Sequence, residues 1–88
     1  MREVEIIPIA VKKAERRGIK KELIEDTVLR PMQVVGGYGG RKVAQSKIIL
    51  EGREYLLRVV YEETGEKHIV VTTYLTSQIS RYWKEEDK

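Results

Sequence analysis

Residues 9–19 read Ile-Ala-Val-Lys-Lys-Ala-Glu-Arg-Arg-Gly-Ile, and this stretch decides the fold of the N-terminal part of the chain. Apolar side chains recur here at helical spacing, which predicts an amphipathic helix with one buried face. The residues of that face are Ile7, Ala10, Val11 and Ala14. Pro8 suits the first turn of the helix, and Gly18 suits the left-handed residue after its last turn. The rest of the chain is expected to pack around this helix.

The outer face of the predicted helix is strongly basic. Lys12 and Arg16 form one pair at a spacing of four residues, and Lys13 and Arg17 form another. Like charges at that spacing destabilise a helix by about 0.2–0.5 kcal/mol for each pair. Two interpretations remain open, namely a solvated basic face and a surface that binds an anion.

The composition excludes several kinds of chemistry. The chain has 88 residues, which suits one small domain of two packed layers, and it has no cysteine, so disulfides, thiolate zinc sites and thiol nucleophiles are excluded. A single histidine, His68, excludes a paired-histidine mechanism and a multi-histidine metal site. Because the acidic residues are scattered, we expect no metal ion and no other cofactor. His68 stands beside a predicted turn, and we predict that it lies at the surface.

Positive charge is concentrated in the first two thirds of the chain. Residues 1–60 contain 13 basic and 8 acidic residues, whereas residues 61–88 contain 4 and 6. This asymmetry favours a surface that meets an anionic partner. No apolar run is long enough to cross a membrane, and the N-terminus lacks the apolar core of a signal peptide, which predicts a cytoplasmic protein with no membrane partner.

Helical and strand patterns together predict an α+β fold. A second helix is expected at residues 20–29, ended by Pro31, and a short edge strand at residues 2–7. Further strands are predicted at residues 32–35, 41–50, 54–62 and 68–75, with a glycine-rich loop at 36–40 and turns at 51–52 and 64–66. We predict two N-terminal helices packed on a twisted, mainly antiparallel sheet of four to five strands. The domain would occupy residues 1–83, and a disordered charged tail residues 84–88.

Arg58 interrupts the apolar run Tyr-Leu-Leu-Arg-Val-Val-Tyr at residues 55–61. This strand and the strand at residues 68–75 are apolar on both faces, so the sheet is expected to be covered on both sides. A guanidinium in such a strand needs partners or a cleft. Three interpretations remain open: an ion pair with Glu54 or Glu62, a side chain that extends to the sheet edge, and a clamp for phosphate.

Two further segments carry residues suited to nucleic acid. The loop at residues 36–40 lacks the spacing of a P-loop and is predicted to be a flexible hairpin loop, but Arg41 and Lys42 after it are candidates to contact a phosphate. Arg81 stands beside two aromatic residues, Tyr82 and Trp83, near the chain end. Rings that stack on unpaired bases, next to cations that hold phosphates, are typical of single-stranded RNA binding. The alternative for Trp83 is a ring that closes the core.

Several short motifs, taken in order, resemble a family of small bacterial and archaeal proteins, a domain of unknown function that is grouped with RelE-like toxins. The family pattern reads His-Ala-x-x-Arg-x-x-x-Arg-Gly-Ile, then a proline after a second helix, Leu-Arg-Val-Val, Val-Val-Thr and a Tyr-Trp ending. Here the first part is Ile9-Ala10, Lys13 and Arg17-Gly18-Ile19. The later motifs are Pro31, Leu57-Arg58-Val59-Val60, Val70-Val71-Thr72 and Arg81-Tyr82-Trp83. The resemblance covers nearly the whole chain.

The resemblance implies a RelE-like fold and a toxin that cleaves RNA without a metal ion and is neutralised by a separate cognate antitoxin protein. RNA, free or associated with the ribosome, would be the substrate. The residues implied in charge stabilisation and acid–base chemistry are Lys13, Arg17, Arg58, Arg81 and Tyr82. The residues expected to bind RNA around them are Lys12, Arg16, Arg41, Lys42 and Trp83.

The chain departs from the family pattern at two positions. Ile9 stands in place of the histidine, and Lys13 stands in place of the first arginine. If the family histidine transfers a proton, this chain has lost that group. The alternative interpretation is therefore a catalytically inactive module of the same fold that binds RNA or a partner protein.

Overall fold

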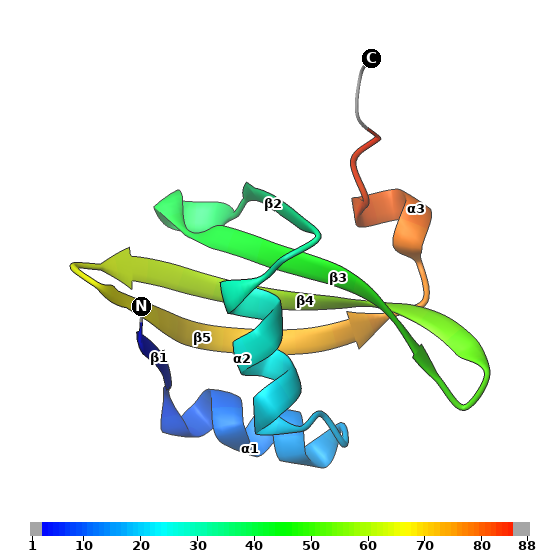
Figure 1. Cartoon of the computed structure of the whole chain (residues 1–88), viewed down its shortest axis with the longest axis horizontal. Coiled ribbons are helices and arrows are strands. Elements are labelled where there is room, and N and C mark those ends of the chain that lie inside the picture. The colour runs from blue at the N-terminus through cyan, green and yellow to red at the C-terminus, as the bar shows by residue number, and fades with distance from the viewer. Residues whose placement is uncertain (1–2, 86–88) are drawn as a thin grey trace.

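The N-terminal segment forms a strand and two helices, as predicted. In the computed structural model, which describes residues 3–85, β1 (Glu3–Ile6) leads into α1 (Pro8–Arg16), and α2 (Lys21–Leu29) follows after a short connection (Figure 1). Pro8 occupies the first turn of α1, and Gly18 follows the helix with a left-handed φ of 70°. None of the described helices is long and apolar enough to span a membrane.

The sheet has five strands in the order β1-β5-β4-β3-β2. The remaining elements are β2 (Gln33–Gly36), the 3-10 helix η1 (Tyr38–Gly40), β3 (Lys42–Leu50), β4 (Arg53–Thr64), β5 (Lys67–Thr76) and α3 (Ile79–Tyr82). Strands β2 to β5 pair antiparallel in sequence order, while β1 pairs with β5 in parallel. The predicted α+β class with a mainly antiparallel sheet is confirmed, and the parallel edge pair was not predicted.

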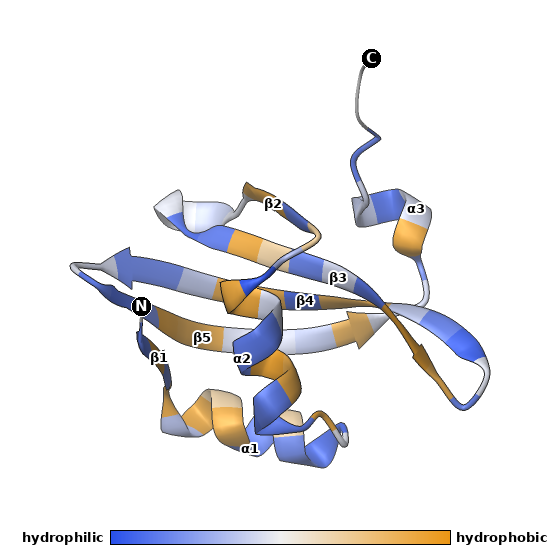
Figure 2. Cartoon of the chain, in the orientation of Figure 1, coloured by the Kyte–Doolittle hydropathy of each residue, from blue (hydrophilic) through white to orange (hydrophobic). Residues whose placement is uncertain are grey.

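One face of the sheet packs against α1 and α2. The helices contribute Ala10, Ala14, Ile19, Ile24 and Val28 to this core, and the strands contribute Ala44, Leu57, Val59, Tyr61 and Val70. The predicted apolar face of α1 is confirmed, because Ala10 and Ala14 are buried while Ile7 and Val11 are half-buried. Figure 2 shows the hydrophobic residues recurring on both helices and along the central strands.

The opposite face of the sheet is also covered. Leu56 is fully buried, and so is the next residue, Leu57, which belongs to the helix-side core. Successive strand residues point to opposite faces, so Leu56 faces away from α1 and α2. The C-terminal segment lies on that side, as its hydrogen bond from Gln45 to the Tyr82 carbonyl shows. The expectation that both faces of the central strands are covered is therefore confirmed.

The prediction that His68 lies at the surface is wrong. His68 is only 6% exposed, because β1 pairs alongside the start of β5 and sets Val4 opposite His68. The Tyr61 ring meets the imidazole edge-on at 5.0 Å between centroids, and the Glu63 carboxylate lies 3.8 Å from Nδ1. A local turn signal could not reveal this burial, since the covering strand lies more than sixty residues away in sequence.

The turn between β3 and β4 offers a test of local backbone preference. Leu50 pairs with Arg53 across a two-residue loop in which Glu51 has φ 50° and Gly52 has φ 76°. Asparagine tolerates this left-handed conformation better than glutamate. We expect Glu51→Asn to raise the free energy of unfolding by about 0.5–1 kcal/mol, measured by thermal unfolding. Glu54→Asn, an exposed strand position, is the control and should give no gain.

Candidate nucleic-acid interface

A row of polar side chains crosses four strands at the centre of the sheet. Gln33 pairs with Gln45, Gln45 with Arg58, and Arg58 with Tyr74. Directly opposed residues of paired strands project to the same face. Because the alternating neighbours Ala44 and Val59 belong to the helix-side core, this row projects to the other face. We call that side of the sheet the Arg58 face.

Arg58 is held by neutral partners. Its Nε donates to Oε1 of Gln45 at 2.9 Å, and its Nη1 donates to the Tyr74 hydroxyl. The guanidinium carbon also lies 4.3 Å from the centroid of the Tyr82 ring. Figure 1 shows how this is possible, because the chain turns back after β5 and places α3 beside β3. Arg58 is half-buried. Two hydrogen bonds from its planar guanidinium and the contact with an aromatic ring fix its side chain.

The ion-pair interpretation of Arg58 is wrong for the part of the chain that the structure describes. Glu62 binds Arg41 instead, with 2.8 Å between Oε2 and Nε. No carboxylate among residues 3–85 lies within salt-bridge distance of the Arg58 guanidinium. A half-buried cation with neutral partners keeps its full positive charge, and an anion from outside would stabilise it.

Gln45 connects Arg58 to the C-terminal segment. It is fully buried, and its Nε2 donates to Oε1 of Gln33 at 2.7 Å and to the Tyr82 carbonyl at 3.1 Å. Gln33 in turn binds the main chain of Lys84 twice, through Nε2 to the carbonyl at 2.6 Å and through Oε1 from the amide at 3.0 Å. These bonds hold Lys84, the first residue of the predicted tail, while residues 86–88 lie outside the described residues.

An open groove of about 490 Å³ lies next to Arg58. Its lining residues are Gly36, Gly37, Tyr38, Arg41, Val43, Arg58, Val60 and Tyr74. Tyr38, at the tip of the β2–β3 connection, is 95% exposed. The loop at residues 36–40 is a hairpin loop, as predicted, and the Gly37 amide closes it by donating to the Arg41 carbonyl at 2.7 Å. The groove therefore brings two arginines together with two tyrosine rings.

The C-terminal residues predicted for the site lie on the Arg58 face. The guanidinium carbon of Arg81 is 5.4 Å from the Tyr82 ring centroid, and Nη1 donates to Gln78. Trp83 is half-buried, with the Lys47 ammonium 4.3 Å from its ring centroid. Of the two candidate cations after the glycine-rich loop, Arg41 lines the groove, whereas Lys42 forms an ion pair with Glu63.

The basic residues of α1 lie elsewhere. Lys12, Lys13 and Arg16 line a second groove together with Pro8 and Ile9, and it shares no lining residue with the groove at Arg58. Arg17 donates from Nη1 to the Thr73 carbonyl at 2.8 Å, beyond the part of β5 that pairs with β1. Arg17 thus ties α1 to the edge of β5. The structure brings Arg58, Arg81 and Tyr82 together but does not join Lys13 to them.

Sequence reasoning missed Gln33, Gln45 and Tyr38. A glutamine is an ordinary residue in isolation, and only strand register sets Gln33, Gln45 and Arg58 in one row. The available signal was a polar residue in the centre of an apolar strand, the same signal that singled out Arg58. Applied to Val-Ala-Gln-Ser at residues 43–46, it would have found Gln45.

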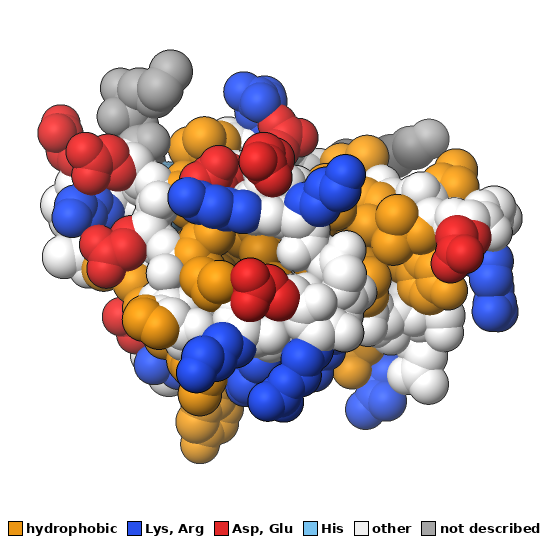
Figure 3. All heavy atoms as spheres, turned by 90° about the horizontal axis from the view of Figure 1, so that it is seen from below, with side chains coloured by type: hydrophobic (Ala, Val, Ile, Leu, Met, Phe, Trp, Pro, Cys, Tyr) orange, Lys and Arg blue, Asp and Glu red, His pale blue; other side chains and the backbone are white. Residues whose placement is uncertain are grey.

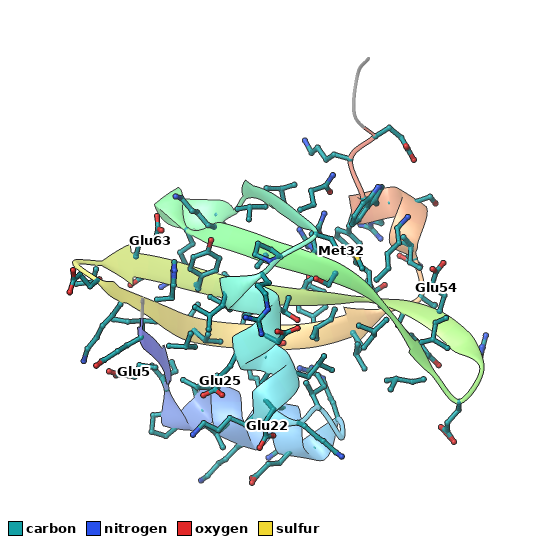
Figure 4. All side chains as sticks on the ribbon, in the orientation of Figure 1. Glu5, Glu22, Glu25, Met32, Glu54 and Glu63 are labelled. Atoms are coloured by element: carbon teal, nitrogen blue, oxygen red, sulfur yellow. The ribbon has the colours of Figure 1, made fainter. Side chains whose placement is uncertain are left out.

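The described acidic residues are too dispersed for a metal centre. Figure 4 labels Glu5 on β1, Glu22 and Glu25 on α2, Glu54 beside the β3–β4 hairpin and Glu63 near the other end of β4. Within residues 3–85 no group of three His, Cys, Asp or Glu side chains could hold a metal ion.

Comparison of the chain with protein-family models, with curated proteins and with solved structures finds no match.

Proposed function

We propose that this chain is a RelE-like protein of a toxin–antitoxin pair that binds single-stranded RNA on the Arg58 face and cleaves it without a metal ion. The observation that carries the proposal is the positive charge of Arg58 at the groove, with which no carboxylate among residues 3–85 forms an ion pair. The planar guanidinium of Arg58 is held in a fixed position. It favours phosphate as the anion, because a guanidinium can bind two phosphate oxygens at once.

The surroundings of Arg58 favour RNA over a small anion. The guanidinium carbon of Arg58 lies 4.3 Å from the Tyr82 ring centroid and 5.6 Å from that of Tyr74, and Tyr38 lines the same groove. Such rings stack on unpaired bases, while Arg81 supplies further positive charge and Arg41, which is paired with Glu62, lines the same groove. A free phosphate would use the cations but would leave the exposed Tyr38 ring without a role.

Cleavage would proceed by attack of the RNA 2′-hydroxyl oxygen on the adjacent phosphorus. The new O–P bond forms as the bond to the 5′-oxygen breaks, leaving a 2′,3′-cyclic phosphate and a 5′-hydroxyl. Arg58 would stabilise the additional negative charge of the pentacoordinate transition state. The Tyr74 hydroxyl, which Arg58 holds in place, would give its proton to the leaving 5′-oxygen while its oxygen takes up the proton of the attacking 2′-hydroxyl, so that no proton is gained or lost.

One observation favours a second candidate function, a binding module without catalysis. Among the described residues that line the groove at Arg58 there is no histidine and no carboxylate to accept the 2′-hydroxyl proton. The position at which the family pattern has its histidine is Ile9, in the separate α1 groove. RNA binding without cleavage would therefore be the result if Tyr74 alone cannot serve both proton transfers.

Arg58→Met is the test of the proposal. We expect the affinity for a fluorescein-labelled oligouridylate to fall at least about tenfold, because a charge-assisted contact to phosphate is lost while the apolar stem is kept. Arg53→Met is the matched control, since Arg53 is an exposed arginine of the same strand, and it should bind as the unaltered protein does. Fluorescence anisotropy measures binding, and a gel measures cleavage with and without EDTA.

The outcomes separate the two candidates. Cleavage that persists in EDTA and disappears in Arg58→Met supports the endoribonuclease, and growth arrest on expression without a partner supports the toxin. RNA binding that depends on Arg58 but produces no cleavage supports the binding module. Equal RNA affinity of Arg58→Met and the unaltered protein would contradict both.

A further inference from the structure

The outer face of α1 carries a second surface that the proposed RNA site does not use. Pro8, Ile9, Lys12, Lys13 and Arg16 line an open groove of about 480 Å³ along this helix. Ile9 is 57% exposed although it is a large apolar residue. The groove thus combines an aliphatic floor with three cationic side chains.

The cations of this groove form no ion pair with the described residues. None of the carboxylates in residues 3–85 lies within salt-bridge distance of Lys12, Lys13 or Arg16. Elsewhere on the surface many cations are paired, namely Lys21, Arg30, Arg41, Lys42 and Lys67. Glu15, the one carboxylate of α1, lines a different groove with Ile19 and Ile24.

Charge is distributed unevenly over the surface that is seen from below. Figure 3 looks onto α1 from below and shows Lys and Arg side chains gathered along the lower margin, whereas blue and red side chains alternate near the upper margin. Lys12 and Arg16 lie one helical turn apart, so their repulsion slightly destabilises the free protein. A negatively charged partner would relieve that repulsion.

The chemistry of the groove favours a protein partner over RNA. The groove offers bases no aromatic ring, because its neutral lining consists of Pro8 and Ile9 alone. RNA phosphates would neutralise the cations but would leave Ile9 exposed to water. A polypeptide segment with an aliphatic side chain flanked by Asp or Glu would cover Ile9 and neutralise the charges together.

We infer that the α1 groove docks an acidic segment of a partner protein, anchored by an aliphatic side chain on Pro8 and Ile9. Lys12, Lys13 and Arg16 bind the carboxylates around that anchor. This site goes beyond the proposed function, since it is separate from Arg58 and requires no RNA. Partner and RNA can occupy the protein at the same time unless the partner extends to the other face.

A display library of random dodecamer peptides, selected on the whole protein, tests the inference. We expect enrichment of peptides that combine Asp or Glu with Leu, Ile or Val. Their affinity should fall at least about tenfold in Lys12→Glu/Lys13→Glu and several-fold in Ile9→Ser. The matched control is Lys20→Glu/Lys21→Glu, the same charge change on exposed residues at the start of α2, and it should bind normally. Circular dichroism verifies that each variant is folded.

Three results would overturn the inference. The first is that no acidic peptides are enriched, and the second is that enriched peptides bind Lys12→Glu/Lys13→Glu and the control equally well. The third is that Lys12→Glu/Lys13→Glu loses oligouridylate binding while peptide binding stays unchanged, which would assign the groove to RNA. Arg58→Met should bind the peptides normally, so failure of the RNA proposal and failure of this inference remain distinguishable.

Discussion

Gln45→Leu is expected to lower the free energy of unfolding by about 3 kcal/mol. The leucine fills a similar volume but removes the acceptor of Arg58 Nε and the donor to both Gln33 and the Tyr82 carbonyl. Each polar group left without a partner costs about 1–3 kcal/mol when it is buried, and Arg58, Gln33 and the Tyr82 carbonyl each lose one partly buried hydrogen bond. Urea unfolding followed by circular dichroism measures the loss.

The same substitution should also weaken RNA binding. Without Gln45, the C-terminal segment keeps its bonds to Gln33 but loses the one at Tyr82, and Arg58 keeps only its hydrogen bond to Tyr74, so the Tyr82 ring and the guanidinium are held less firmly. Gln78→Leu is the control, because Gln78 is exposed, and it should change stability by less than about 0.5 kcal/mol. A Gln45→Leu variant as stable as the unaltered protein would show that the network does not hold the segment.

Leu57→Ala and Leu56→Ala should both be strongly destabilising, each by about 2–5 kcal/mol. The two leucines are adjacent, both are fully buried, and they face opposite sides of the sheet. Leu57 packs in the helix-side core, whereas Leu56 lies on the face of the sheet that the C-terminal segment contacts. Chemical denaturation of the two variants compares the two faces directly.

The comparison distinguishes a sheet covered on both faces from a sheet with one open face. Ile49→Ala is the reference, because Ile49 is 71% exposed, and it should cost well under about 1 kcal/mol. A cost for Leu56→Ala close to that of Ile49→Ala would mean that the C-terminal segment does not stay on the sheet in solution. The guanidinium of Arg58 would then be more open than the structure shows.

The position of Ile9 bears on how catalysis could be restored. A histidine at this position would stand among Lys12, Lys13 and Arg16, in a groove that shares no residue with the one at Arg58. Ile9→His alone is therefore not expected to add a proton acceptor to the Arg58 groove. Cleavage created by that substitution would indicate that the α1 groove itself binds the scissile phosphate.

Much of the fold could be predicted from local pattern. Apolar spacing located α1 and α2, Pro8 and Gly18 marked the limits of the first helix, and glycine-containing turns separated the strands. These features depend on backbone preferences and side-chain periodicity within about ten residues. The predicted strand at residues 54–62 was shorter than β4 (Arg53–Thr64), because the pairing with β3 and β5 extends the strand past its apolar centre.

The candidate site could be predicted only in part. Arg58, Arg81 and Tyr82 were identified because each residue type is conspicuous in its local context, and the structure places them on one face. Gln45 and Gln33 depend on the register of three strands, and the burial of His68 depends on a parallel strand from the other end of the chain. Non-local pairing of this kind leaves no local signature.

The sequence by itself determined the five strands and the two N-terminal helices, the apolar face of the first helix and the need of Arg58 for partners, whereas η1 and α3 were not predicted. Only the tertiary structure decided which partners Arg58 has, and it separated the charges of α1 from that arginine by setting them on different grooves. The physical reason is that helix periodicity and turn preference act between near neighbours, whereas strand register and the return of the C-terminal segment join residues far apart in the chain.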